Sequence, residues 1–290
     1  MKFGSPDDMN LDDLNFNLPP DHELSLIHKK LSEDFMLYVG CAKWGREEWK
    51  GLVYPEDSSE KDFLLLYKDY FNAVELNATF YNIKKSNIIS WSEKVLGSHF
   101  LFCPKFPRRI SHLKRLNDVE DLTDYFIQMC QKFGDNLGTT FLQMPENYTP
   151  KYFDRLENYM RSLPVDFPVF VELRHEGWYL DKTVFNKTVE MLQTLKKGLI
   201  ITDTALRRDV IHQCLTIPDV MVRFNGYGLH KTDYERLDQW VARLKDWKQK
   251  GLGKVYFFMH QPDELNTPKT CAYFIQKANE VLGTTLHIPI

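Results

Sequence analysis

Short apolar runs alternate with amphipathic stretches along most of this chain, and the alternation limits the folds that it can adopt. Eight runs rich in β-branched and aromatic residues are typical of strands: 36–43, 73–79, 99–105, 138–143, 169–175, 199–203, 220–225 and 254–260. Most are apolar at consecutive positions, as parallel strands covered by helices are. The order strand, helix, strand throughout predicts an α/β fold, and specifically a (β/α)8 TIM barrel.

The length and the start of the chain predict one domain preceded by an arm. The 290 residues are 43% hydrophobic and 27% charged, which suits a single barrel domain. The first 34 residues are acidic and contain Asn and Pro, so we predict a flexible N-terminal arm over 1–34 and a barrel domain over 35–290. The first strand is followed by no G-x-G-x-x-G string, which disfavours a dinucleotide-binding sheet.

Charge and cysteine content bear on partners and location. A net charge of −3 and a pI of about 6.3 exclude a globally basic nucleic-acid binder, although a local basic cleft remains open. The five cysteines form no C-x-x-C pair, which fits a reducing compartment. No export signal and no apolar stretch of about 18 residues is present. We therefore predict a cytoplasmic protein without a membrane partner, and its oligomeric state stays open.

Seven of the eight predicted strands end in polar residues of the kinds that perform chemistry. These residues are Glu75, Asn77, Lys105, Gln143, Glu172, Arg174, Asp203, Arg223, Asn225 and His260. Because side chains alternate across a strand, the two members of a pair such as Glu75 and Asn77 share one face. Their apolar neighbours should face the helices, so we expect the polar set to point into the C-terminal mouth of the barrel.

The expected mouth balances three carboxylates against three cations, and this balance favours an anionic small-molecule ligand. Lys105, Arg174 and Arg223 would hold the anion. A metal site would need several carboxylates and histidines without cations beside them. No metal or other cofactor is therefore predicted, and a divalent metal is kept as a minor alternative.

Roles for the other polar residues follow from their chemistry. Glu75 or Glu172 would move a proton, with Asp203 and His260 assisting, in a hydrolase, lyase or isomerase type of reaction. Asn77 and Gln143 would orient the ligand. Further candidate ligand contacts are Asn225 at a strand end and three aromatic residues that follow strand ends, Trp44, Tyr81 and Trp178, which could stack on a base or sugar or simply pack the loops.

Three alternatives stay open beside this hypothesis. The charges could form a purely structural network in which Glu75 and Arg223, for example, satisfy each other. The protein could process or bind nucleic acid through basic residues after the third strand, namely Arg108, Arg109, Lys114 and Arg115. It could also be a ligand-binding module without catalysis.

Several strings, taken together, resemble a known family. WGREEWKGLVYP at 44–55, VELNATFY at 74–81, FCPKFP at 102–107, FLQMP at 141–145, VELRHEGW at 171–178 and VRFNG at 222–226 resemble, in order, the signatures of the YecE-like family, also called domain-of-unknown-function family 72. The resemblance covers about residues 36–283. It implies a TIM-type barrel with the strand-end residues named above, and it supplies no reaction. At the level of fold alone, it implies a distant likeness to the endonuclease IV and sugar-isomerase group, whose sites hold metals.

The chain departs from the family pattern at three places. Cys41-Ala42-Lys43 replaces the usual small residues, Asn225 stands where a histidine is expected, and the last strand ends in Met259-His260-Gln261. An asparagine cannot serve as a general base. His260 could take that role if it faces Asn225 across the mouth.

Overall fold

The fold is an α/β arrangement in which all strand pairs are parallel. A computed structural model describes residues 11, 14–28 and 34–289. Its strands are β1 (Met36–Cys41), β2 (Ala73–Leu76), β3 (Leu101–Pro104), β4 (Thr140–Gln143), β5 (Val169–Glu172), β6 (Gly198–Leu199), β7 (Ile201–Thr204), β8 (Val220–Asn225) and β9 (Lys254–His260). They form three sheets with the orders β1-β9-β8-β7, β2-β3 and β4-β5-β6. The eight predicted strand positions are confirmed, with β6 and β7 together occupying the sixth.

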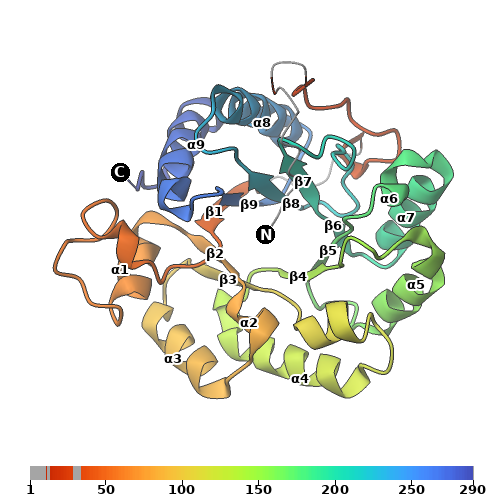
Figure 1. Ribbon diagram of the computed structural model, residues 1–290, viewed down its shortest axis with the longest axis horizontal. Helices are drawn as coiled ribbons and strands as arrows, with labels where there is room; N and C mark the ends of the chain where they lie inside the picture. Colours follow the sequence, from red (N-terminus) through yellow and green to blue (C-terminus); the bar gives the residue numbers. More distant parts are fainter. Residues whose placement is uncertain (1–10, 12–13, 29–33, 290) are drawn as a thin grey trace.

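The strands lie around a common centre with helices outside them (Figure 1), yet their hydrogen-bonded ladders do not close into one barrel. Between β1 and β2, side chains replace the ladder. Asn72 accepts from the Val39 backbone N–H at 2.7 Å and donates to the Leu37 carbonyl at 2.8 Å. The Tyr67 hydroxyl accepts from the Cys41 N–H at 2.7 Å. The α/β class is confirmed, and the closed barrel expected from the sequence is not.

The helices cover the outer side of the strands. Their bounds are α1 (Phe63–Tyr70), α2 (Ala78–Tyr81), α3 (Lys85–Val95), α4 (Glu120–Cys130), α5 (Phe153–Ser162), α6 (Gly177–Leu180), α7 (Lys182–Thr194), α8 (Lys231–Gln249) and α9 (Thr267–Leu282). Short helical turns lie at Leu26–His28, Glu47–Trp49, Arg109–Leu113, Gln131–Asn136, Pro150–Tyr152 and Glu264–Asn266. Within the described ranges, no helix combines the length and apolarity that crossing a bilayer requires.

The core has an outer and an inner part. Outward-facing strand residues such as Leu76 and Phe224 pack with Trp240 and Phe274 of the covering helices. Inward-facing Phe141, Phe170, Met221 and Phe258, among others, form a separate apolar cluster within the ring of strands. This inner cluster leaves the carboxyl ends of the strands as the place where inward polar side chains gather.

The described part of the N-terminal arm lies against the rest of the chain. The backbone N–H of Leu18 donates to Gln239 of α8 at 2.9 Å, and that of His22 donates to the Gln213 carbonyl at 2.9 Å. Ile27 is buried in the main core. Paired backbone groups and a buried apolar side chain thus connect residues 14–28 to the rest of the chain. The flexibility of the arm stays a prediction. Apart from Leu11 and Asp34, the rest of the predicted arm lies outside the described residues.

Gly40 of β1 permits the close approach of β1 and β2. A Cβ atom at this position would lie 1.9 Å from the Ala73 carbonyl oxygen, a backbone atom of β2. We expect Gly40→Ala to lower the free energy of unfolding by about 1–3 kcal/mol or more, because the two strands must separate. Urea denaturation measures this change. Gly45→Ala is the matched control, since no atom lies within 4 Å of its Cβ position; equal denaturation midpoints for the two variants would contradict the expectation.

Candidate functional site

Side chains from several strand ends meet in one buried group at the carboxyl ends of the strands. We call it the central polar cluster; it comprises Glu75, Asn77, Lys105, Gln143, Glu172, Arg223 and His260. Arg223 of β8 joins its two sides. The guanidinium donates from Nε to Glu75 Oε2 at 2.8 Å and from Nη1 to Glu172 Oε2 at 2.6 Å, and none of the three side chains is exposed. Seven of the ten predicted strand-end residues thus meet in one group, and their roles stay predictions.

A chain of hydrogen bonds extends the cluster across β3, β4 and β5. Lys105 Nζ donates to Gln143 Oε1 at 2.7 Å, and Gln143 Nε2 donates to Glu172 Oε2 at 2.8 Å. The Lys105 ammonium also lies 4.4 Å from the centre of the Phe80 ring, a cation–π contact. Burial and the nearby charge of Arg223 lower the pKa of Lys105 to about 8. Lys105 therefore titrates closer to neutrality than an ordinary lysine.

The two carboxyl groups of the cluster are held ionised. Burial alone would raise the pKa of Glu75, but Arg223 and His260 outweigh it and bring the pKa well below the usual range. Burial likewise opposes ionisation of Glu172, and Arg223 followed by Arg174 lowers its pKa. One oxygen of Glu172, Oε1, is buried without a hydrogen-bond partner. Their lowered pKa values keep both groups ionised at neutral pH, so neither is poised as a general acid.

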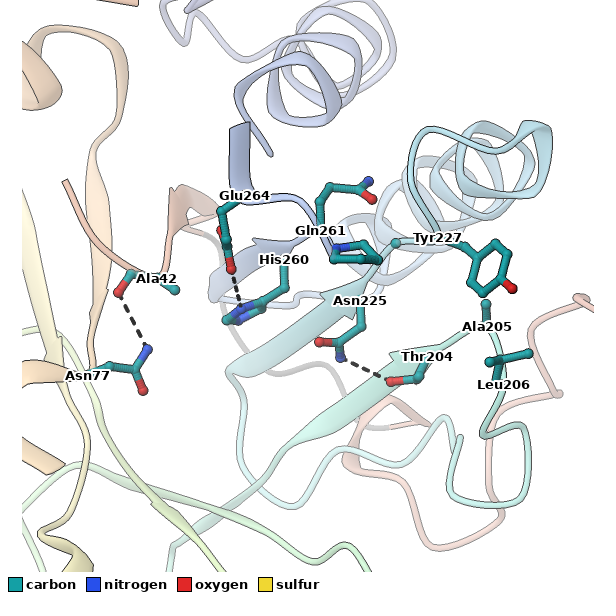
Figure 2. Close-up of a pocket in the computed structure, with 12 residues that line it drawn as sticks. Ala42, Asn77, Thr204, Ala205, Leu206, Asn225, Tyr227, His260, Gln261 and Glu264 are labelled. Carbon is teal, nitrogen blue, oxygen red and sulfur yellow. Dashed lines mark hydrogen bonds and ion pairs between the residues drawn. The ribbon is translucent and has the colours of Figure 1, made fainter. Parts of the chain in front are cut away.

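His260 is the titratable group of the cluster that faces open space. Its Nε2 atom lies 3.1 Å from Glu75 Oε2. Its Nδ1 atom lies 3.8 Å from Glu264 Oε1, a contact that Figure 2 shows. Burial would lower the pKa of His260, but Glu75 and Glu264 raise it above its usual value. An imidazole held between two carboxylates can store a proton near neutral pH and release it to a neighbour.

A cavity of about 410 Å³ opens beside His260. Its lining includes Asn77, Thr204, Asn225, Tyr227 and Glu264, and the described lining contains no lysine or arginine. Asn225 Nδ2 donates to Thr204 Oγ1 at 3.0 Å. The Asn225 oxygen is buried without a partner, and in Figure 2 it points toward the side on which His260 lies. We call this space the strand-end cavity.

Asp203 does not point into the cluster, so its predicted role there is wrong. On β7, Thr202 pairs with Arg223 and Asp203 pairs with Phe224, which places Asp203 on the outer face. Its carboxylate accepts from Arg236 at 2.9 Å and from Trp240 Nε1 at 2.7 Å, and it also pairs with Arg208. The prediction takes the last polar residue of the run as inward, but Thr202 and Thr204 hold the inward positions of β7, so Asp203 between them faces outward.

Arg174 and Trp178 also differ from expectation. β5 ends at Glu172, so Arg174 lies at the rim, where it pairs with Glu146 and remains 16% exposed. Trp178 is fully buried in a core cluster, and its Nε1 donates to the Tyr148 carbonyl at 2.6 Å. Its predicted ligand contact is therefore wrong, because no surface of the indole is accessible.

The other two aromatic candidates and the basic segment lie near the rim. Trp44 is partly buried, with its ring edge-on to Trp91 at a centroid distance of 5.1 Å. Tyr81 is 76% exposed on α2. Three of the four basic residues proposed for nucleic acid are exposed in the segment after β3, namely Arg108, Arg109 and Lys114, whereas Arg115 donates to the Asn147 carbonyl at 2.8 Å.

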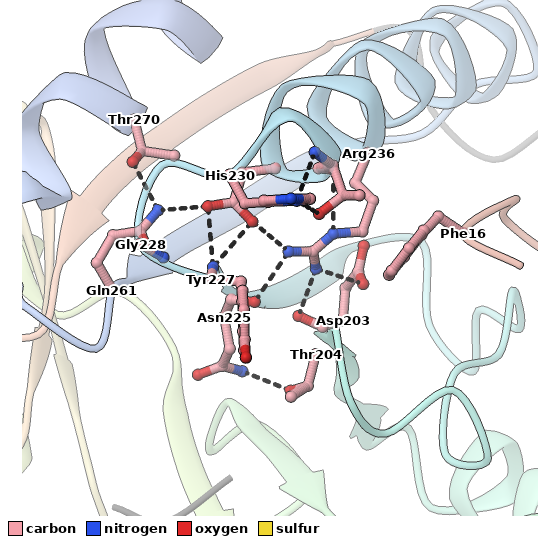
Figure 3. A network of polar contacts seen from close by, with 12 residues as sticks. Phe16, Asp203, Thr204, Asn225, Tyr227, Gly228, His230, Arg236, Gln261 and Thr270 are labelled. Atoms are coloured by element: carbon pink, nitrogen blue, oxygen red, sulfur yellow. Dashed lines mark hydrogen bonds and ion pairs between the residues drawn. The ribbon is translucent and has the colours of Figure 1, made fainter. Parts of the chain in front are cut away.

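Arg236 of α8 supports the cavity from behind, and the sequence prediction missed it. It donates to Asp233 at 2.8 Å and to the Asn225 carbonyl at 3.1 Å. Asp233 in turn accepts from the Tyr227 N–H at 2.9 Å and from Gln261 Nε2 at 3.2 Å (Figure 3). The available signal was spacing, because Asp233 and Arg236 lie on the same helical stripe as Trp240, where an apolar residue is expected.

The cluster does not fit a divalent metal. Arg223 occupies oxygens of both Glu75 and Glu172, and a cation placed there would repel the guanidinium. Across the part of the chain that the structure describes, no three His, Cys, Asp or Glu side chains are grouped so that they could hold one ion.

Fold and site together define a parallel α/β protein whose polar site lies at the carboxyl ends of its strands. Residues 38–288 match the family model described as "Protein of unknown function DUF72". The chain therefore belongs to the DUF72 family, and the resemblance seen in the sequence is confirmed. The described arm, residues 11 and 14–28, precedes the matched region.

Relatives and solved structures agree with this assignment. The chain is 28% identical over 262 residues to the UPF0759 protein YecE of Escherichia coli (strain K12), a match that covers 81% of this chain and 89% of that protein. A crystal structure of a DUF72 family protein from Thermotoga maritima MSB8 matches with a TM-score of 0.62 and 21% identity, over 86% of this chain and all of that one. One from Enterococcus faecalis V583 matches with a TM-score of 0.61 and 17% identity, over 86% of this chain and 96% of that one. At these identities, the structural matches support the fold alone.

Proposed function

We propose that this protein is an enzyme of the hydrolase, lyase or isomerase type that acts on a small hydroxyl-bearing molecule in the strand-end cavity. The observation that carries the proposal is the position of His260, which lines a cavity of about 410 Å³ and is held between Glu75 and Glu264. In this proposal the three sheets serve as one (β/α)8 framework, in which segments after the strands build the active site.

An unpaired acceptor in the cavity wall favours a ligand that donates hydrogen bonds. Asn225 Oδ1 is a buried acceptor without a partner, and such an atom costs about 1–3 kcal/mol until a donor reaches it. A ligand hydroxyl supplies that donor. Tyr227, which is 43% exposed at the cavity wall, offers a ring face on which the C–H groups of a polyol or sugar can lie.

His260 is the residue that would move the proton. Glu75 fixes its Nε2 side and is itself fixed by Arg223 and Asn77. This support keeps the imidazole in one orientation and favours its protonated form, as a general acid requires. Glu75 is thus a positioning residue in the proposal. The sequence analysis, by contrast, predicts that Glu75 or Glu172 moves the proton.

Binding of an anion is a second candidate function. An anion is the ligand class predicted from the sequence, and it would bind on the β3–β5 side of the site. Lys105 and Arg174 lie on the β3–β5 side, and their charges, after the effect of burial, lower the pKa of His112 to about 4. Burial is the largest cause of this shift, and the two positive charges add to it. Two cations on this side of the site would favour a phosphate or carboxylate group.

One screen separates the two candidates. We expect polyols or sugars to bind the wild type and to lose at least tenfold in affinity in Asn225→Leu, because the buried acceptor is removed. His260→Gln should abolish turnover while largely retaining binding. Lys105→Met should leave the affinity for polyols and sugars unchanged and should weaken the binding of inorganic phosphate instead. Isothermal titration and product analysis measure both effects.

The same screen contains the results that would overturn the proposal. Polyol affinity that is equal in the wild type and Asn225→Leu would contradict the cavity assignment. Binding without turnover across the panel would indicate a non-catalytic module. Binding of single-stranded DNA that falls steeply with salt would favour the nucleic-acid alternative.

A further inference from the structure

A second cavity, of about 440 Å³, lies where the N-terminal arm meets the start of α7. The arm contributes Asp21 and His22, and the main body contributes Tyr179, Phe185, His212 and Gln213. It shares no lining residue with the strand-end cavity. One wall precedes residue 38, where the match to the family begins, so this cavity depends on a segment outside the family pattern.

Gln213 brings an unpaired donor to this cavity. Its side-chain oxygen accepts from Arg243 at 3.2 Å, and its backbone carbonyl accepts from the His22 N–H at 2.9 Å. Its amide nitrogen Nε2 is buried without a partner, and the residue as a whole is 1% exposed. Because the oxygen is fixed by Arg243, the amide cannot flip to satisfy the nitrogen without losing that bond. The nitrogen therefore remains able to donate to an acceptor from outside the protein.

Aromatic rings form the rest of the inner wall. Tyr179 stacks on His212, with ring centroids 5.6 Å apart and ring planes 17° apart. His22 meets Phe185 edge-on at 4.9 Å. Both ring nitrogens of His212 are engaged, Nε2 with the Ile200 carbonyl and Nδ1 with the Cys214 N–H. The wall thus offers flat apolar surface beside the unpaired donor of Gln213.

Charged groups stand at the edge of the cavity. Lys182 pairs with Glu23 at 3.0 Å, and both side chains are largely exposed. Asp209 pairs with Arg207 at 2.8 Å. These charges neutralise each other locally, so the cavity attracts neither anions nor cations strongly, and a neutral ligand fits best.

We propose that this second cavity binds a small, neutral, planar aromatic or heteroaromatic molecule that carries a carbonyl oxygen, which accepts from Gln213 Nε2 while the ring packs against the aromatic wall. The inference goes beyond the function proposed above. It does not depend on that function, since the two cavities have no lining residue in common.

Acetophenone and toluene are the matched probes, because they share a phenyl ring and a methyl group and differ by the carbonyl between them. We expect acetophenone to bind the full chain and to shift the NMR resonances of His22 and Tyr179. Gln213→Glu keeps the shape and the oxygen that meets Arg243, but it replaces the donor with a second acceptor. Acetophenone has no donor for that acceptor, so its affinity should fall at least tenfold in this variant, whereas toluene affinity should not change.

Controls make the result decisive in either direction. Gln276→Glu, an exposed change on α9, should leave acetophenone affinity unaltered. If Gln213→Glu does not fold, the wild-type NMR shifts still test the site. Equal affinity for acetophenone and toluene in the wild type, equal acetophenone affinity in wild type and Gln213→Glu, or shifts that avoid His22 and Tyr179 would each overturn the proposal.

Discussion

Replacing Arg223 with methionine is expected to lower the free energy of unfolding by about 3–5 kcal/mol. The guanidinium is fully buried and bonds to Glu75 and Glu172, which are also fully buried. Its loss leaves two carboxylates in the interior with their main counter-charge gone, and a lone buried charge is far more costly than a paired one. Chemical denaturation followed by circular dichroism measures the change.

An exposed ion pair provides the control for this prediction. Arg161 pairs with Glu157 on α5 at 2.7 Å, with the arginine side chain 52% exposed. Arg161→Met should therefore cost at most about 1 kcal/mol, because solvent screens the pair. If both methionine variants lose the same amount, burial of the Arg223 pair is not the source of its effect.

A triple variant separates a structural role of the cluster from a functional one. Glu75→Leu, Glu172→Leu and Arg223→Met together remove every charge of the bridge and keep similar side-chain volumes. Buried ion pairs replaced in this way are often as stable as before, or more so. We expect the triple variant to recover most of the stability lost in Arg223→Met. Recovery accompanied by loss of ligand binding would mean that the charges are there for function.

The pH dependence of stability follows from the same carboxyl groups. The pKa values of Glu75 and Glu172 are lower in the folded chain than the ordinary value of about 4.3. Their contribution is therefore present above about pH 4.3 and is lost as the pH falls toward their folded-state values. The wild type should lose stability in that acid range, and the triple variant should lose less.

Much of the architecture follows from local patterns in the sequence. Strand positions and the meeting of Glu75, Glu172 and Arg223 could be predicted, because apolar runs and the two-residue alternation of strands are local properties. The gap between β1 and β2 could not, since it depends on Asn72 and Tyr67 entering between the strands. Side chains that replace backbone hydrogen bonds leave no periodic signal.

The errors in the candidate site have one physical origin. The prediction takes a polar residue at the end of an apolar run as inward, whereas Thr202 and Thr204 hold the inward positions of β7 and β5 ends at Glu172, before Arg174. Asp203 therefore faces outward by strand alternation, and Arg174 lies beyond its strand, where the alternation no longer applies. Arg236 was missed for a different reason, since it reaches the site from a helix behind the sheet.

A second large loss of stability is expected on replacing Asp203. This residue lies outside the cavity, but it pairs with Arg236, which bonds to the Asn225 carbonyl in the cavity wall. Asp203→Leu should lower the free energy of unfolding by about 3–5 kcal/mol, because Arg236 is fully buried and would lose a charge partner there. Trp240 Nε1 would lose its acceptor as well. Asp203→Asn, which keeps an acceptor but removes the charge, should cost less.

The exposed pair of Asp209 with Arg207 gives the matched control, and Asp209→Leu should cost about 1 kcal/mol or less.

Asp203→Leu should also weaken polyol binding in the strand-end cavity although the residue touches no ligand there, because Arg236 bonds to both Asp203 and the Asn225 carbonyl. Denaturation and titration on the same samples test both parts. Full polyol affinity in a folded Asp203→Leu variant would show that the wall keeps its shape without this support, and would leave Asp233 as the partner that fixes Arg236.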